Sequence, residues 1–231
     1  MTQTLRAFLV ALSFGAMTMP LDAQTPTPDL SGITALRIQG QGSRTVVIAD
    51  AAATPGINVT QKSNVFCQVE PAFTRQGDTL IVEIQHRGFL VGFKCDATVN
   101  VTMPAGIAVA VDQPQAVVEL KGLYSDIAVA TDKLVLTLDG GADSLRVKAD
   151  KAVITADFTT HKAGQPPVID IAVPTLVANV GYPRDMAIEY TVDAPVAVFS
   201  RGMPQTPGAD GRLTITSQLL KGALYPVPAR S

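Results

Sequence analysis

The side chains that most often carry acid, base or metal chemistry are scarce in this chain of 231 residues. It contains two histidines, His86 and His161. A Ser-His-Asp triad or a zinc site with several histidines therefore has little material. The sequence also lacks the Gly-x-Ser-x-Gly, His-Glu-x-x-His and phosphate-binding glycine patterns, so a serine hydrolase, a zinc protease and a nucleotide enzyme all lose support. We interpret both histidines as exposed polar residues.

Carboxylates are the other candidate groups for chemistry. Six aspartates fall between apolar segments in the middle of the chain: Asp126, Asp132, Asp139, Asp143, Asp150 and Asp157. Two carboxyl groups on one face, roughly 5 to 9.5 Å apart and with separated pKa values, would allow acid–base cleavage of a glycosidic bond. Charged residues between apolar strands are also expected at solvated corners, and this is the interpretation we favour. We predict no catalytic residue and a protein that is not an enzyme.

A glycine and aspartate turn is the one segment with the composition of a cation site. Residues 139 to 143 read Asp-Gly-Gly-Ala-Asp. Calcium-binding turns of this kind supply carboxylate and carbonyl oxygens, but they occur as a repeated Gly-Gly-x-Gly-x-Asp. Because the segment occurs once, we interpret it as a corner between strands, and we predict neither a metal nor a cofactor.

The two cysteines, Cys67 and Cys95, fit a structural disulfide better than a redox or metal pair. They lie far apart in sequence, and no Cys-x-x-Cys is present. An oxidising compartment favours a bond between them. Closing a loop of about 28 residues would restrict the unfolded chain and stabilise the fold by about 3 kcal/mol.

The segment enclosed by this predicted disulfide is a candidate partner-binding loop. Residues 88 to 94 read GFLVGFK and place four large apolar side chains close together: Phe89, Leu90, Val91 and Phe93. Exposed, they would form an apolar patch suited to a protein partner. The alternative is burial against the first strands, since the disulfide would hold the segment near the core.

The N-terminal segment has the three-part layout of a secretory leader. Residues 1–6 carry one positive charge, residues 7–17 are apolar, and residues 18–23 end at the small residue Ala23. The apolar run is shorter than the roughly 20 residues that span a bilayer. We therefore predict a Sec signal peptide cleaved after about Ala23, a periplasmic or secreted protein, and no transmembrane anchor in the mature chain.

Composition narrows the class of partner. Eighteen basic residues against twenty acidic ones give a net charge of −2, which argues against a basic face that neutralises a run of phosphates. We therefore expect no nucleic-acid partner. The chain has no Trp and only 5% aromatic residues, which weakens the case for a sugar-stacking site.

The elements that position these residues are β-strands. Apolar and polar residues alternate along most of the chain, and no segment of helical length shows a clear apolar stripe. In the middle of the chain twelve apolar positions recur at a step of nine residues: Val109, Val111, Val118, Leu120, Ile127, Val129, Leu136, Leu138, Leu145, Val147, Ile154 and Ala156. Short units of this kind bury their inward faces only by stacking on one another.

We therefore predict an all-β fold, a single-stranded parallel β-solenoid with short strands every nine residues. Turns of two units, about 18 residues, and of three units, about 27, both fit the pattern. An antiparallel β-sandwich is the alternative, because a strand at intervals of roughly 8 to 12 residues is also its signature.

The chain divides into four segments by this reasoning. We predict a signal peptide over 1–23, an N-terminal β region with the disulfide loop over 24–104, solenoid repeats over 105–200, and a C-terminal loop, last strand and tail over 201–231. Residues 219–231 are expected to be a tail over the surface or the last edge. Segments 24–231 are expected to form one domain.

Residues 99–104 read Val-Asn-Val-Thr-Met-Pro, an alternating strand closed by a proline, and short apolar units follow. This pattern resembles the bacterial "putative auto-transporter adhesin head domain" family and related adhesin-like β-strand repeat domains of unknown function. The likeness covers about Leu30 to Phe199. The resemblance implies a right-handed parallel β-solenoid in an exported bacterial protein.

Three functions of different classes fit these observations. The first is a non-enzymatic, exported, adhesin-like β-solenoid, an interaction or structural module of the bacterial envelope whose partner is an unknown envelope protein or glycan. The second is a glycan-active or glycan-binding β-helix protein, which requires a groove with paired aspartates. The third is a carrier of a hydrophobic ligand, which requires a roomy interior.

Overall fold

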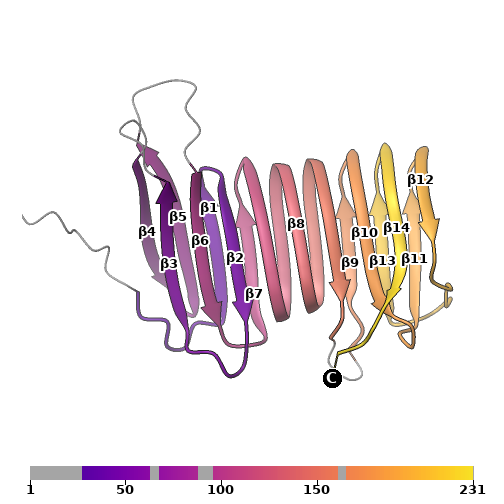
Figure 1. Cartoon of the computed structure of the whole chain (residues 1–231), viewed down its shortest axis with the longest axis horizontal. Coiled ribbons are helices and arrows are strands. Elements are labelled where there is room, and N and C mark those ends of the chain that lie inside the picture. Colours follow the sequence, from indigo (N-terminus) through magenta and orange to yellow (C-terminus); the bar gives the residue numbers. More distant parts are fainter. Residues whose placement is uncertain (1–27, 63–67, 88–95, 161–164, 231) are drawn as a thin grey trace, which may run out of the picture.

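The computed structural model describes residues 28–62, 68–87, 96–160 and 165–230. Within these ranges the protein is a mixed β-sheet of fourteen strands without a helix, which confirms the all-β prediction (Figure 1). It follows that this part of the chain offers no helix of the length and hydrophobicity needed to cross a bilayer.

The strands in chain order are β1 (Ala35–Gly40), β2 (Ser43–Ala49), β3 (Gly56–Lys62), β4 (Gln68–Gln76), β5 (Thr79–Arg87), β6 (Asp96–Met103), β7 (Ile107–Asp112), β8 (Gln115–Phe158), β9 (Val168–Ala172), β10 (Thr175–Pro183), β11 (Ile188–Asp193), β12 (Val196–Arg201), β13 (Gly211–Thr216) and β14 (Leu219–Val227). The pairings form two series, which Figure 1 shows as two layers. One runs β4-β5-β1-β7-β8-β9-β13-β11, and the other runs β3-β6-β2-β8-β10-β14-β12.

The core lies between the two layers. All twelve positions of the nine-residue register are buried, as expected when each strand turns alternate side chains inward. The register also gives the size of a turn, because Val109 of β7 pairs in parallel with Ile127 of β8, the position two units further along the chain. Val118, midway between them, pairs with Thr45 in the other layer. Two nine-residue units therefore make one turn, with one strand in each layer.

Strand β8 differs from the predicted pattern of short strands separated by corners. It runs unbroken for 44 residues through two layers. The reason is that one ladder of backbone hydrogen bonds begins almost where the previous one ends. The ladder to β2 ends at Gly122, and the ladder to β7 begins at Tyr124. The backbone therefore stays paired around the corner instead of forming a loop.

The order of the turns departs from the order of the chain at both ends. The turn made by β1 and β2 lies between β5–β6 and β7–β8, and the turn made by β13 and β14 lies between β9–β10 and β11–β12 (Figure 1). The expectation of a surface tail or a last edge from residue 219 is therefore wrong as far as Val227. Strand β14 is an internal strand, because it pairs with β10 on one side and with β12 on the other, and its Leu220 and Leu224 are buried in the core.

A purely parallel arrangement is also wrong at one end of the stack. All pairs of described strands are parallel except β3 with β6 and β4 with β5. Strand β4 contains Pro71, which lacks an N–H and is tolerated at the edge of a sheet. The antiparallel alternative is partly consistent with this end, and the structure supports a mixed all-β sheet.

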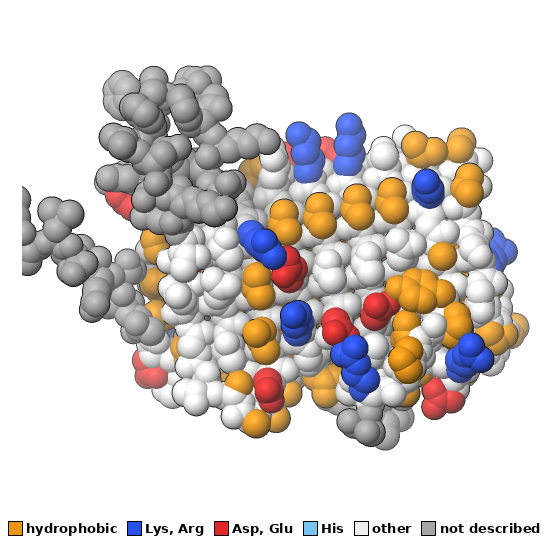
Figure 2. Space-filling model, viewed as in Figure 1, with side chains coloured by type: hydrophobic (Ala, Val, Ile, Leu, Met, Phe, Trp, Pro, Cys, Tyr) orange, Lys and Arg blue, Asp and Glu red, His pale blue; other side chains and the backbone are white. Residues whose placement is uncertain are grey.

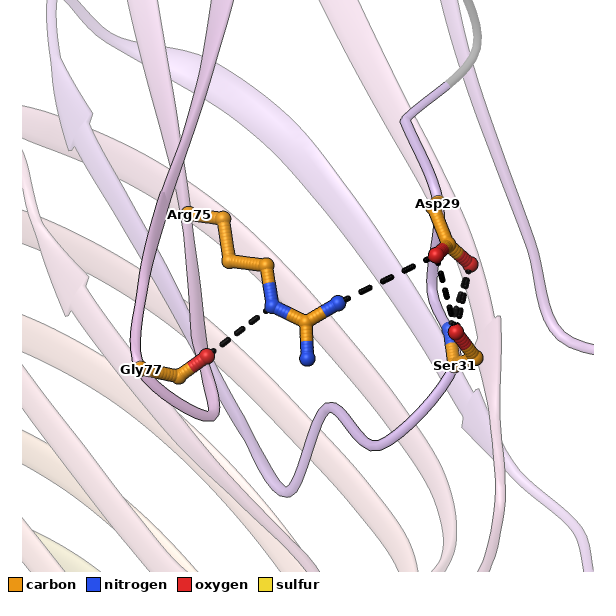
Figure 3. Close-up of polar contacts among 4 residues, drawn as sticks. All are labelled: Asp29, Ser31, Arg75 and Gly77. Atoms are coloured by element: carbon orange, nitrogen blue, oxygen red, sulfur yellow. Dashed lines mark hydrogen bonds and ion pairs between the residues drawn. The ribbon is translucent and has the colours of Figure 1, made fainter.

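The first described residues are attached to the β4–β5 hairpin (Figure 3). The Asp29 carboxylate accepts hydrogen bonds from the backbone N–H and hydroxyl of Ser31, and these bonds lower the pKa of Asp29. Arg75 of β4 lies 4.0 Å from the same carboxylate and donates from Nε to the carbonyl of Gly77, at the hairpin turn. The chain is therefore fixed to the hairpin before β1 begins.

Candidate functional site

The residues predicted to form the disulfide and the partner-binding loop lie outside the described residues. They are Cys67, Cys95, Phe89, Leu90, Val91 and Phe93. His161 also lies outside, and for His86 the structure describes the backbone in β5 but not the side chain. The disulfide, the loop and both histidine interpretations stay predictions.

The six candidate aspartates do not form one catalytic group. Asp126 forms an ion pair with Arg146 at 2.9 Å, on the outer face of β8. Asp139 is held by Arg230 of the C-terminal segment, at 2.8 and 3.0 Å. Asp157 accepts a hydrogen bond from the hydroxyl of Tyr225. These three carboxylates have partners that join neighbouring segments of the stack.

The glycine and aspartate segment of residues 139–143, interpreted from the sequence as a corner between strands, lies at a corner of the stack. Gly140 and Gly141 lie so close to the backbone of neighbouring turns that an added Cβ would overlap a carbonyl oxygen, well inside the 3.0 Å that real Cβ atoms keep. Over the described ranges, no three histidine, cysteine or acidic side chains come close enough to share a metal ion. The glycines in this segment therefore serve close packing of the backbone.

A shallow trough lies on the outer face of the layer that contains β1, β7 and β9. Two overlapping depressions form it, of about 570 and 530 Å³. Small side chains make its floor: Ala110, Ala128, Ala130, Ala149 and Ala172. We call this surface the alanine trough.

Strand register explains why the trough exists. Arg37 of β1 pairs with Ala110 of β7, and Ala110 pairs with Ala128 of β8. These side chains share one outward-facing row, and neighbouring strands lie about 4.8 Å apart. Because Ala110 and Ala128 on neighbouring strands carry only methyl groups, the sheet surface between them is uncovered, while longer side chains stand on either side. The hollow is thus a property of the sequence at fixed positions of each turn.

Charged side chains of both signs form the walls. Arg37 forms an ion pair with Asp112 at 3.4 Å across one end. Arg146, Lys148 and Asp170 stand on the other side. The exposed pair of Arg37 and Asp112 contributes little to stability.

Two of the candidate aspartates line the same surface. Asp132 and Asp150 flank one of the depressions, next to Lys148. They are separated by two nine-residue units, and both are exposed, so they occupy equivalent places on successive turns. They are the two of the six candidate aspartates that line this surface.

The outer face of the other layer is apolar along one line. Val117, Val135 and Val153 are 38%, 44% and 45% exposed, and each follows the one before it by a full turn of two units. Val153 pairs with the half-buried Val177 of β10. Figure 2 shows this row of hydrophobic side chains running along the stack. We call it the valine row.

Sequence reasoning missed both surfaces. The sequence signal for the trough is a small residue between the two buried positions of a nine-residue unit. Ala110 and Ala128 have this place in units that lie one full turn apart. Until the size of a turn is known, an alanine at this place cannot be told from the many other apolar residues of the chain, because it is not known which alanines lie side by side. Once a turn is known to hold two units, both rows can be read from the sequence.

Comparison with known proteins reports on the fold. No protein-family model matches the chain. The curated proteins likewise contain no match. Among solved structures, the chain is similar to a "putative cell adhesion protein" from Clostridium sporogenes, with a TM-score of 0.50 and 10% identity over 87% of this chain and 97% of that one. A "putative adhesin" from Bacteroides fragilis aligns with a TM-score of 0.33 and 12% identity over 87% and 95% of the two chains.

At these identities the likeness concerns architecture alone. The Clostridium protein aligns over almost its whole length, so the resemblance is not limited to one hairpin or one turn. We conclude that this chain shares its all-β fold with a solved bacterial protein named for cell adhesion.

Proposed function

We propose that this protein is an exported, non-enzymatic, adhesin-like β-solenoid, an interaction module of the bacterial envelope that binds its partner in the alanine trough. The observation that carries the proposal is the alanine floor of the trough. Its alanines are in register on successive turns, and charged side chains stand on both sides of them. Such a surface is open along the stack and suits an extended polar partner, an envelope protein or a glycan.

The solenoid part of the proposal rests on the parallel pairs. Val109 pairs with Ile127, and Ala110 with Ala128, at the same constant step of one turn. Each added turn repeats the same outward positions, which is how stacked repeats build long binding surfaces. Rows of side chains held by a rigid sheet lose little entropy when a partner binds.

The adhesin-like part is supported by two observations of different kinds. The sequence pattern resembles adhesin head domains, and the fold is similar to that of the protein from Clostridium sporogenes named for cell adhesion. Export is proposed from the leader over residues 1–23, which places the trough outside the cytoplasm.

A glycan-active protein is the second candidate. The observation in its favour is that Asp132 and Asp150 flank one depression of the trough. In this case the pair would hydrolyse a bound glycan, and Asp150→Asn would abolish release of reducing ends without weakening binding. Binding without release of reducing ends from any envelope glycan would leave the adhesin-like function as the better proposal.

The experiment is a binding assay of the mature chain against an envelope extract and a glycan array. Ala128→Phe fills the floor of the trough, and we expect it to lower retention at least tenfold. Thr137→Phe is the matched control, because Thr137 is an exposed residue of β8 outside the residues that line the trough. Equal retention by both variants would contradict binding in the trough.

A third variant separates the trough from the predicted loop. Phe89→Asp with Phe93→Asp removes the apolar character of the loop at residues 88–94. Loss of retention in this double variant alone would move the binding site from the trough to the loop and leave the interaction function intact.

A further inference from the structure

Strand β12 is the least covered strand of the described sheet. It pairs only with β14, through its inner edge. Every residue of β12 is exposed or half-buried, and Val196 and Val198 are 57% and 75% exposed. Its outer edge therefore presents backbone N–H and C=O groups with no strand beside them in the part of the chain that the structure describes.

The other terminal strand of the same turn is protected. The backbone N–H of Thr206 donates to the carbonyl of Ile188 at 2.8 Å, and the amide of Gln205 donates to the carbonyl of Tyr190 at 3.3 Å. The segment after β12 thus covers the outer edge of β11. The opposite end of the stack ends in antiparallel strands, one of which carries Pro71.

Strand β12 has few of the devices that protect exposed edges, and they lie at its ends: Pro195 precedes it and Arg201 closes it. Its sequence is VAVFSR, without lysine, proline or an inward-pointing acid. Its one charge, Arg201, lies 5.8 Å from the ring centroid of Tyr190. An edge of this kind is a template for another strand.

We propose that β12 pairs in antiparallel orientation with β12 of a second copy of this chain, across a two-fold axis. Residues directly opposite one another must point to the same face. The register that places Val198 opposite Val198 meets this condition. It also places Val196 opposite Ser200, and Ala197 opposite Phe199.

The side chains of β12 are complementary to themselves in this register. The most exposed valine meets its own copy at the axis, and the exposed Ala197 gains cover from Phe199, which already packs against the core of its own chain. Arg201 falls opposite Pro195, so like charges do not face each other. Isologous contacts of this kind close as dimers.

Val198 lies on the line of the valine row. Val177 pairs with Lys221 of β14, which pairs with Val198, so Val198 lies on the same line as the valine row and is separated from it by Lys221. Pairing of two β12 strands would bring the two copies of Val198 together, with Lys221 beside each of them. A contact of two short strands belongs to the small, reversible class of interface.

The test is analytical ultracentrifugation of the mature chain from about 1 to about 500 µM, a range suited to weak association. We expect a reversible dimer. Val198→Lys places a charge at the axis and should weaken association at least tenfold. Val135→Lys, on an exposed valine of the valine row inside the stack, should leave the dimer unchanged. Circular dichroism of all three proteins checks that they are folded.

A second variant gives the register directly. Val198→Cys should form a disulfide-linked peptide that joins two copies at position 198, found by mass spectrometry, and Val135→Cys should not. Three results would overturn the proposal: a monomer throughout the range, a dimer that Val198→Lys does not weaken, and growth beyond the dimer into open stacks. The trough lies on other strands, so this outcome does not depend on the proposed function.

Discussion

Gly140 lies directly against the backbone of Gly122, one turn earlier in the stack. A Cβ at Gly140 would overlap the Gly122 carbonyl oxygen, and a Cβ at Gly122 would overlap the Ala49 carbonyl oxygen, each well inside 3.0 Å. Both glycines have positive φ, +148° and +103°. Three successive turns thus meet at a corner that only glycine allows.

Replacing this glycine should therefore destabilise the stack. We expect Gly140→Ala to lower the free energy of unfolding by more than about 2 kcal/mol, because the methyl group meets backbone atoms that cannot move aside. Urea denaturation measures the change. Gly56→Ala is the control, since nothing lies within 4 Å of its added Cβ, and it should be neutral within about 0.5 kcal/mol. Equal effects of the two changes would contradict the corner packing.

Two buried tyrosines should respond in opposite ways to loss of the hydroxyl. The Tyr124 hydroxyl accepts from the N–H of Lys121 at 3.1 Å and donates to the carbonyl of Val47 at 2.8 Å. The Tyr182 hydroxyl is buried and has no hydrogen-bond partner among the described residues, while its ring stacks on Phe158 with centroids 5.1 Å apart.

We therefore expect Tyr124→Phe to lower the free energy of unfolding by about 1 to 3 kcal/mol, because it leaves buried backbone groups unpaired. Tyr182→Phe should be neutral or stabilising, since it removes an unpaired polar group and keeps the stacked ring. Parallel thermal and urea unfolding of the two variants tests the difference. A larger loss in Tyr182→Phe would show that its hydroxyl has a partner.

The repeat could be predicted from sequence because it is local. Val109, Val118 and Ile127 recur at nine residues, and burial of all twelve register positions follows from alternation within each strand. The turn size could not be predicted, because units of nine fit turns of two or three strands equally. The turn size depends on which units pair with each other. Pairing of every second unit and pairing of every third unit give the same alternation of apolar and polar residues.

The positions of the terminal turns could not be predicted either. Leu36 of β1 pairs with Val109, far along the chain, and with Leu80 on its other side. Its alternating pattern is the same as that of any other inward strand, so nothing in the sequence places it between two later turns. The alanine trough depends on this insertion, because Arg37 reaches the wall of the trough through it.

Asp78, at the turn between β4 and β5, should make the stability of the fold depend on pH in the acid range. Thr34 donates its hydroxyl to Asp78 at 2.5 Å, and this hydrogen bond is the largest cause of the lowered pKa of Asp78. A carboxyl with a pKa below its ordinary value of 3.8 stabilises the fold above that value. The contribution is lost as the pH falls through the lowered pKa.

Thr34→Val removes the hydroxyl at nearly constant volume, so we expect the pKa of Asp78 to rise toward its ordinary value. Carbon-detected NMR titration of the carboxyl groups measures it. Asp29 is the internal control, because its pKa is lowered chiefly by hydrogen bonds from Ser31 and should not move. An unchanged Asp78 titration in the variant would show that another donor holds the carboxylate.

Alkaline pH should weaken the fold through its tyrosines. Burial raises the pKa of Tyr124, Tyr182 and Tyr225 above the ordinary value of 10.0. The folded protein therefore holds these protons more tightly than the unfolded chain. The resulting stability is fully present below pH 10 and is lost as the pH rises toward the raised pKa values. Urea midpoints measured between about pH 9 and 12 should fall continuously.

One of these tyrosines can be altered separately from the others. The pKa of Tyr225 is raised first by burial, then by its hydrogen bond to Asp157 and by the negative charge of that carboxylate. Asp157→Asn removes the charge and keeps the burial, so a single tyrosine should ionise at lower pH when absorbance of tyrosinate is followed. Asp150→Asn, at a residue that lines the trough, should leave the curve unchanged. If both variants ionise as the parent does, Asp157 does not act on Tyr225 in solution, and the contact between β14 and the last residues of β8 is looser than the structure shows.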